Sequence, residues 1–477
     1  MAQSPQPAPS ASGSGGTVNI IKDKAYYKHF FAIAIPIGLQ NLLTVSVSLA
    51  DNIMVGQLGD IAVSSVFMAN QVTNILQMFL TGMSAALLIM GSHFLGRDDR
   101  TGVRQVTGLT LRFGLAAALL IMVFTLLFPE QTLRLFTSEE AVIAGGRNYL
   151  RIVSLSFPVF ILQGLMIAAL RSVEAVKIGT AVTLIALFTN VGLNALLIFG
   201  LFGFPALGVE GAAIATLIAR IVSCAVVIHY AFIKDERLGF RWQDVLTRNP
   251  ELTRRFIRTG APVIIGDLTW GINIAVQGAI IGRLGTVAIT SIAIANTIFN
   301  LVAVFIYAFR DAGSMQIGQA VTRDSLPKIK QLTRTLQLLF LAMGIVTGLL
   351  MFISRPLFLS FYPAISPAVR AETMRYLIVL SVTVIGSAYQ VGCLTGIVRG
   401  GGSTSFVLWN DLAFVWLLVI PSAALAAFVF NAPALIVFIC LKSDQILKCI
   451  VAVIKVNGYT WIKDLTGHRD KSAYVDA

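Results

Sequence analysis

The 477-residue sequence has few charged residues and lacks the motifs that ATP-driven or hydrolytic membrane proteins require. Only 12% of its residues are Asp, Glu, Lys or Arg, whereas 56% are hydrophobic, a composition unlike that of a soluble core. No GxxxxGK[ST] phosphate-binding loop, HExxH zinc motif or GxSxG nucleophile motif occurs. Residues 399–404 are glycine-rich but lack the lysine, and a turn at a helix end accounts for them. We therefore expect that the protein is not an enzyme.

Metal-binding and disulfide patterns are absent as well. The four cysteines, Cys224, Cys393, Cys440 and Cys449, lie in apolar stretches without CxxC spacing. We interpret them as small packing residues. The four histidines are far apart in the sequence. We expect no structural metal and no cofactor other than a coupling ion.

Long apolar runs occupy almost the whole sequence. A hydrocarbon layer of about 30 Å requires about 20 apolar residues per helix, and backbone groups in lipid must be satisfied within helices or closed barrels. We predict an all-α polytopic membrane protein with twelve transmembrane helices, at residues 29–55, 61–95, 106–128, 148–170, 178–200, 209–233, 259–283, 287–321, 332–353, 374–398, 404–428 and 433–456.

Residues 36–97 recur without a gap as residues 262–323. Unrelated apolar segments rarely match at Pro, Gly, Asn and Arg in one register, so we interpret this match as a duplication. Six helices per half predict two pseudo-symmetric six-helix bundles with the same orientation, related by an axis along the membrane normal. The matching pairs include Pro36 and Pro262, Gly56 and Gly282, Gly59 and Gly285, Asn70 and Asn296, Asn74 and Asn300, and Arg97 and Arg323.

The duplication also predicts the domain organisation. Residues 25–233 form the N-lobe with helices one to six, and residues 259–456 form the C-lobe with helices seven to twelve. A cytoplasmic linker at residues 234–258 joins the lobes. Residues 1–24, which begin with a Pro-, Ser-, Ala- and Gly-rich stretch, are predicted to be a disordered cytoplasmic tail, and residues 457–477 a second cytoplasmic tail. No signal peptide is expected.

Lys and Arg gather in alternate loops, most densely in the linker. Their distribution predicts that both termini are cytoplasmic and accounts for the net charge of +13 without a nucleic-acid partner. We expect a multi-pass monomer in the plasma (inner) membrane, with the lipid bilayer as its surroundings.

Without an ATP site, a duplicated membrane protein is best interpreted as a secondary transporter, which needs an ionisable group within the membrane. Asp51 shares a face of the first helix with Asn41, Thr44 and Ser48. Placing an Asp at the centre of a transmembrane helix costs about 2.5–3.5 kcal/mol of insertion free energy. A protein retains an acid at this cost where the carboxylate binds an ion or a substrate. The alternative is that Asp51 lies at the depth of the lipid headgroups, where its carboxylate is solvated and has no binding role.

Paired amides form further candidates. Asn190 and Asn194 are four residues apart on the fifth helix, a spacing that suits either ion ligation or helix–helix hydrogen bonding. A second pair of amides recurs in both lobes, and we predict either packing between lobe helices or substrate contacts for Asn70, Asn74, Asn296 and Asn300.

The C-lobe has a different candidate site, because Gln277 stands at the position equivalent to Asp51. Asp267 shares a face of the seventh helix with Trp270, Asn273 and Gln277. An acid, an aromatic ring and two amides suit a cationic amphipathic small molecule, so we predict that these four residues bind substrate. An ion pair between Asp267 and Arg310, or another buried base, is the alternative.

Three segments resemble the multidrug and toxic compound extrusion (MATE) family. They are the stretch from Pro36 to DNIMVGQLG at 51–59, GVEGAAIAT at 208–216 and LTGIVRGGGS at 394–403. The resemblance covers residues 25–460. It implies a V-shaped cleft between the lobes and a secondary antiporter that exports organic cations and drugs in exchange for H⁺ or Na⁺ by alternating access.

The resemblance also implies that Asp51 is the carboxylate of the cation site, with Asn190 and Asn194 beside it, and that these residues hold Na⁺ if Na⁺ is the coupling ion. Some members have an acid one turn after the fifth-helix Asn, where this sequence has Asn194, and the stretch 387–397 has no acid. The choice between H⁺ and Na⁺ therefore stays open.

A flippase for a lipid-linked precursor, from the same superfamily, is the alternative function. It would need a basic central cavity for a pyrophosphate. Arg220 and Arg310 favour it, whereas Asp51 and Asp267 oppose it.

Overall fold

The computed structural model describes residues 20–58, 60–136, 139–235, 237–281, 284, 286–360 and 366–465. These residues form helices joined by short connections, with no strand among them. The N-terminal half contains α1 (Lys24–Gly56), α2 (Asp60–Leu95), α3 (Arg100–Leu127), α4 (Pro129–Arg134), α5 (Glu140–Ser154), α6 (Phe157–Ser172), α7 (Lys177–Phe199), η1 (Leu201–Gly203), α8 (Gly208–His229) and η2 (Tyr230–Lys234).

A short helix, α9 (Trp242–Leu246), lies in the linker. The C-terminal half contains α10 (Pro250–Ile281), α11 (Thr286–Arg323), α12 (Leu326–Ser360), α13 (Pro367–Gln390), η3 (Val391–Val398), α14 (Thr404–Ala413), η4 (Phe414–Val419), α15 (Ile420–Ala424), η5 (Leu425–Val429), α16 (Ala434–Lys442) and α17 (Asp444–Asn457).

Helix starts differ from the hydropathy-based boundaries because polar caps lie beyond the apolar runs. The Asp23 side chain accepts a hydrogen bond from the backbone N–H of Ala25, and α1 therefore begins at Lys24. Helix α10 begins at Pro250, nine residues before the predicted span, because Asn249 caps it by accepting from the N–H of Leu252 and proline suits a first helical position.

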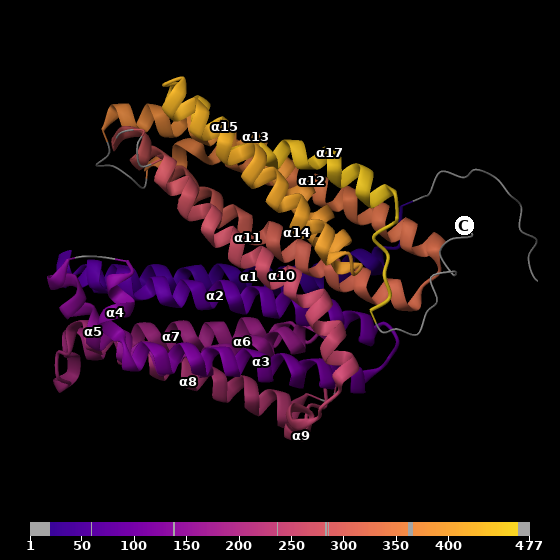
Figure 1. Cartoon of the computed structure of the whole chain (residues 1–477), viewed down its shortest axis with the longest axis horizontal. Coiled ribbons are helices and arrows are strands. Elements are labelled where there is room, and N and C mark those ends of the chain that lie inside the picture. The colour runs from indigo at the N-terminus through magenta and orange to yellow at the C-terminus, as the bar shows by residue number, and fades with distance from the viewer. Residues whose placement is uncertain are drawn as a thin grey trace, which may run out of the picture.

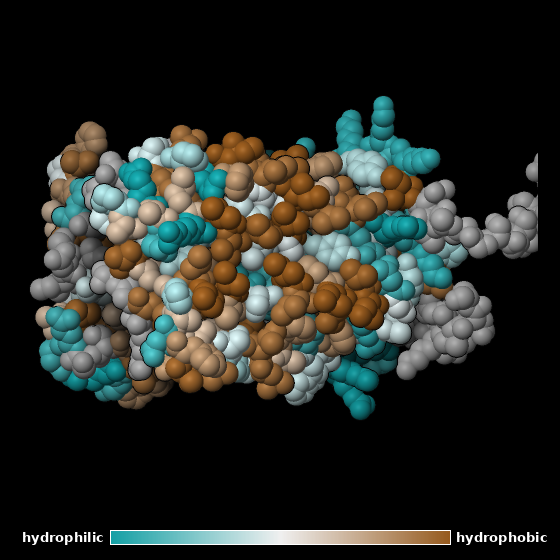
Figure 2. Space-filling view, turned by 90° about the horizontal axis from the view of Figure 1, so that it is seen from above, coloured by the Kyte–Doolittle hydropathy of each residue, from teal (hydrophilic) through white to brown (hydrophobic). Residues whose placement is uncertain are grey.

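Ten helices among the described residues are long and apolar enough to cross a membrane, or eleven if α5 and α6, bent by 48°, form one span. The predicted twelfth span is divided into α16 and α17 at Ser443. The two helices have 9 and 14 residues, so neither alone is long enough to cross a membrane. Figure 2 shows hydrophobic side chains over the middle of one face and hydrophilic ones toward its right-hand end.

The helices form two groups, as the duplication predicts. In Figure 1, α1–α8 form one group and α10–α17 the other, and the groups approach each other near α9 and spread apart toward α4 and α5. Packing between the groups follows the repeat. Gly38 of α1 faces Ala308 of α11, and Gly82 of α2 faces Ile264 of α10. In the repeat, Gly38 is equivalent to Ile264 and Gly82 to Ala308, so the repeat converts one contact into the other.

The pseudo-twofold axis runs between α2 and α11. Ser92 lies against Gly318, and Gly96 lies against Thr322; each pair consists of a residue and its own repeat equivalent, so both lie at the axis.

A hydrogen bond within each lobe is also repeated. Ser65 donates to the carbonyl of Val142 at 3.0 Å, and its equivalent Ser291 donates to the carbonyl of Val369 at 3.1 Å. The two pseudo-symmetric bundles are thereby confirmed.

Candidate functional site

Asp51, Asn190 and Asn194, far apart in the sequence, form one hydrogen-bonded cluster in the N-lobe. Asp51 Oδ1 accepts from Asn194 Nδ2 at 2.8 Å, and the same amide nitrogen lies 3.3 Å from Asn190 Oδ1. Asn190 Nδ2 in turn donates to Thr216 Oγ1 of α8 at 3.4 Å. Helices α1, α7 and α8 thus each contribute to one polar site inside the lobe.

The cluster has an unsatisfied acceptor beside the carboxylate. Asn190 and Asn194 are 3% and 0% exposed, and Asn194 Oδ1 is buried with no hydrogen-bond partner. Buried polar atoms in folded proteins are nearly always paired, so an orphan calls for an explanation. Carbonyl and carboxylate oxygens are ligands for hard cations. No group of three or more His, Cys, Asp or Glu residues in the described ranges could hold a metal ion.

Two residues that the sequence did not place in this cluster lie within electrostatic range of Asp51: Tyr149 and Arg220. Tyr149 donates to Asn70 Oδ1 at 3.3 Å. Arg220 Nη1 donates to Ser156 Oγ at 2.6 Å, and its guanidinium lies 4.5 Å from the centre of the Phe160 ring. In the sequence, Tyr149 could have been recognised because a tyrosine recurs near the equivalent position of the second half, at Tyr376.

In the C-lobe, Asp267 forms an ion pair. Both of its carboxylate oxygens lie 3.3 Å from guanidinium nitrogens of Arg399, and Arg399 is only 8% exposed. Its partner is therefore Arg399 rather than Arg310. Arg310 instead forms an ion pair with its neighbour Asp311 at 2.8 Å, and Arg171 lies 3.6 Å from the Asp311 carboxylate.

Of the other residues predicted on this face, Trp270 lies about one helical turn from Asp267, whereas Gln277 lies farther along α10. Gln277 donates to Asn273 Oδ1 at 3.0 Å, but ten residues along a helix separate Gln277 from Asp267 by about 15 Å. Trp270 is 42% exposed. Asn70 and Asn296 are half-buried, whereas Asn74 and Asn300 are exposed.

The lobes are connected by hydrogen bonds gathered at the end rich in Lys and Arg. His93 Nε2 lies 2.9 Å from the carbonyl of Gly400, and Thr322 Oγ1 donates to the carbonyl of His93 at 2.9 Å. Gln319 donates to Glu174 Oε1 at 2.9 Å. Asp51 lies about 40 Å along α1 from its first residue, near the opposite end, where the lobes spread apart in Figure 1.

Comparisons with known proteins agree with this architecture. The family model described as MatE matches residues 36–196 and 262–425. A Rhizobium meliloti (strain 1021) protein described as "Probable multidrug resistance protein NorM" is 28% identical over 65% of this chain and 67% of its own. A Bacillus subtilis (strain 168) protein described as "Uncharacterized transporter YisQ" is 23% identical over 91% of this chain and 94% of its own.

Two solved structures show the same fold. The crystal structure of a MATE protein in complex with MaL6 has a TM-score of 0.82 and 17% identity, covering 90% of this chain and 96% of that chain. The outward-facing structure of a multidrug resistance transporter of the MOP superfamily has a TM-score of 0.81 and 17% identity, with the same coverage.

Proposed function

Because the chain belongs to the multidrug and toxic compound extrusion (MATE) family of membrane transporters, we propose that it exports organic cations, including drugs, in exchange for H⁺ or Na⁺ by alternating access. The observation that carries this proposal is the N-lobe cluster, in which the carboxylate of Asp51 stands beside the orphan oxygen of Asn194. A coupling cation would neutralise the first and satisfy the second.

Ion binding would act on the lobes through α1. This helix carries Asp51 and also packs against α11 of the C-lobe where Gly38 faces Ala308. Neutralising Asp51 removes the need to solvate a charge and changes how α1 packs against α7. Drug and ion would then favour different lobe arrangements, so that exchange follows from a shift between two states.

In the described arrangement the lobes are connected near the linker and spread apart at the other end, which we assign to the outside on the basis of the Lys and Arg distribution. Release of the coupling ion into the cytoplasm requires contacts between the lobes, such as the one between His93 and Gly400, to break.

Substrate selectivity for cations is proposed to arise from acids near the space between the lobes. Asp267 would meet a cationic guest only by sharing its carboxylate with Arg399, since the two are paired. The indole of Trp270, exposed on the same helix, offers a face for cation–π attraction. We also propose a monomer in the plasma membrane with both termini in the cytoplasm, and no cofactor beyond the coupling ion.

The flippase alternative is not favoured, because it requires excess positive charge for a pyrophosphate. Arg310 is paired with Asp311 and Arg399 with Asp267, while Arg220 lies within electrostatic range of Asp51. Arg310 and Arg399 are therefore compensated by ion pairs, and the negative charge of Asp51 opposes that of Arg220.

The test is transport by the purified protein in proteoliposomes carrying an imposed Na⁺ or H⁺ gradient. We expect one of the two gradients to drive uptake or release of a cationic dye such as ethidium, with loss of the signal when an ionophore collapses that gradient. Gradient-independent movement of a lipid-linked pyrophosphate, without dye movement, would establish the flippase instead.

A further inference from the structure

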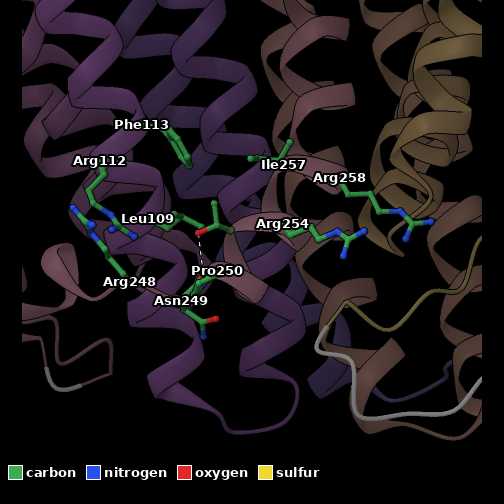
Figure 3. A pocket seen from close by; sticks show the side chains of 10 residues that line it. Leu109, Arg112, Phe113, Arg248, Asn249, Pro250, Arg254, Ile257 and Arg258 are labelled. Carbon is green, nitrogen blue, oxygen red and sulfur yellow. Dashed lines mark hydrogen bonds between the residues drawn. The ribbon is translucent and has the colours of Figure 1, made fainter.

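A hollow of about 810 Å³ lies beside the linker, away from the clusters around Asp51 and Asp267. Figure 3 shows it between α3 of the N-lobe and the start of α10. Its wall thus combines an N-lobe helix, the end of the linker and the first turns of the C-lobe. The lining residues are Leu109, Arg112, Phe113, Arg248, Asn249, Pro250, Thr253, Arg254, Ile257 and Arg258.

Four of the lining residues are arginines, and none is paired with a carboxylate anywhere in the described ranges. Glu251, the acid closest to them in the sequence, bonds Arg255 instead. Asn249 is occupied as the cap of α10, and Thr253 donates to the Asn249 carbonyl at 2.8 Å. The hollow therefore carries an uncompensated positive charge.

The arginines are placed unequally around the hollow. In Figure 3, the guanidinium groups of Arg112 and Arg248 lie toward one side, whereas Arg254 and Arg258 extend from α10 away from the centre of the hollow. Arg248 precedes α10 in the linker, and Arg112 comes from α3. An anion seated between Arg112 and Arg248 would also experience the potential of the two α10 arginines at the rim.

The opposite part of the wall is apolar and open. Phe113 is 41% exposed and Ile257 is 52% exposed, and the Phe113 ring stacks on Phe256 with centroids 6.3 Å apart. A free phosphate has no apolar part that such a surface could bury. An amphiphile with an anionic headgroup and alkyl chains matches both parts of the wall.

The depth of the hollow agrees with a lipid headgroup. Helix α3 has 28 residues, which span about 42 Å, against a hydrocarbon layer of about 30 Å. If Leu127 ends at the outer boundary, the inner boundary falls about 20 residues earlier, near Thr107, and Arg112 starts about 7 Å inside it. An arginine at this depth extends its guanidinium toward the lipid phosphates.

We propose that this hollow is a binding site for an anionic phospholipid of the cytoplasmic leaflet. The phosphate bonds Arg112 and Arg248, and the acyl chains lie along Phe113 and Ile257. A lipid held in this way connects α3 to the linker and to α10, and so stabilises the arrangement in which the lobes meet on the cytoplasmic side.

The test is lipid retention by the purified full-length protein, measured by native mass spectrometry and by the rise in Tm on adding lipid. The probes are phosphatidylglycerol, phosphatidylcholine and inorganic phosphate. We expect phosphatidylglycerol to bind and raise Tm, and R112Q/R248Q to weaken its binding about thirtyfold, the factor expected for two charges near a membrane surface. The matched control R323Q/K328Q removes the same charge from exposed residues on the same side and should leave binding unchanged.

Three results would overturn the proposal. Equal retention of phosphatidylcholine would reduce the site to an apolar groove, and full competition by inorganic phosphate would make it a site for free anions. A loss in R323Q/K328Q as large as in R112Q/R248Q would mean that overall surface charge attracts the lipid. If the double variant does not fold, R248Q alone, outside any helix, should still weaken binding about fivefold; parent affinity in R248Q would refute the assignment of that arginine.

Discussion

Asn194 donates a 2.8 Å hydrogen bond to Asp51 although the two residues are 143 positions apart in the chain. This bond joins α7 to α1, and α1 contacts the C-lobe through Gly38 and Ala308. A change of charge at Asp51 therefore acts on a helix that contacts both lobes.

The first prediction concerns the amide partner. Asn194→Ala removes the donor to Asp51 and the orphan oxygen together, and leaving a buried acceptor unpaired costs about 1–3 kcal/mol. We expect a lower Tm and loss of the additional stabilisation that the coupling ion gives the parent protein. Thermal unfolding with and without Na⁺, and at several pH values, measures both effects. Asn300→Ala, at an exposed position, is the control, and an ion-induced stabilisation unchanged in Asn194→Ala would contradict the assignment.

The second prediction separates structure from substrate binding at Asp267. Asp267→Asn leaves Arg399 without its carboxylate in a largely buried position, which costs about 3 kcal/mol. The double variant Asp267→Asn/Arg399→Gln should recover part of that loss, as a double-mutant cycle on unfolding would show. If Asp267 also binds drug, the double variant should bind a cationic dye more weakly than the parent protein does. A dye affinity equal to that of the parent protein would show that Asp267 has only a structural role.

Sequence patterns predicted the elements of this fold better than the contacts of its acids. Apolar runs mark the helices, and the match of residues 36–97 with 262–323 predicts which helices are equivalent. Neither pattern predicts that Asp267 pairs with Arg399, 132 positions away, because Arg310 lies in an equally apolar segment and the choice depends on how the helices pack. The bond between Tyr149 and Asn70 is likewise a consequence of packing.

The third prediction tests the contact at the pseudo-twofold axis. A Cβ added at Gly318 would collide with Ser92 Oγ, so Gly318→Ala should disfavour the arrangement in which the lobes meet beside the linker. We expect slower efflux and greater labelling of a cysteine introduced on the cytoplasmic half of α2. Gly192→Ala is the matched control, since nothing lies within 4 Å of the added atom. Equal behaviour of the two variants would show that the contact does not limit transport.

The fourth prediction concerns orientation. In a variant without the four native cysteines, Asp98→Cys and Leu246→Cys should react only with reagents that enter the cytoplasm. Leu135→Cys, at a position that is 75% exposed near the other end, should react from outside. Labelling of position 246 by an impermeant reagent in sealed cells would reverse the topology.

The central claim is that Asp51 couples the ion to the drug, and Asp51→Asn tests it most directly. Asparagine mimics the neutral carboxyl at every stage of the cycle, so that the ion gradient can no longer change the charge on α1. Drug efflux in proteoliposomes and equilibrium dye binding to the purified variant are the two measurements. The account predicts a folded protein that still binds dye but shows no gradient-driven efflux; efflux at the parent rate with Asp51→Asn would contradict it.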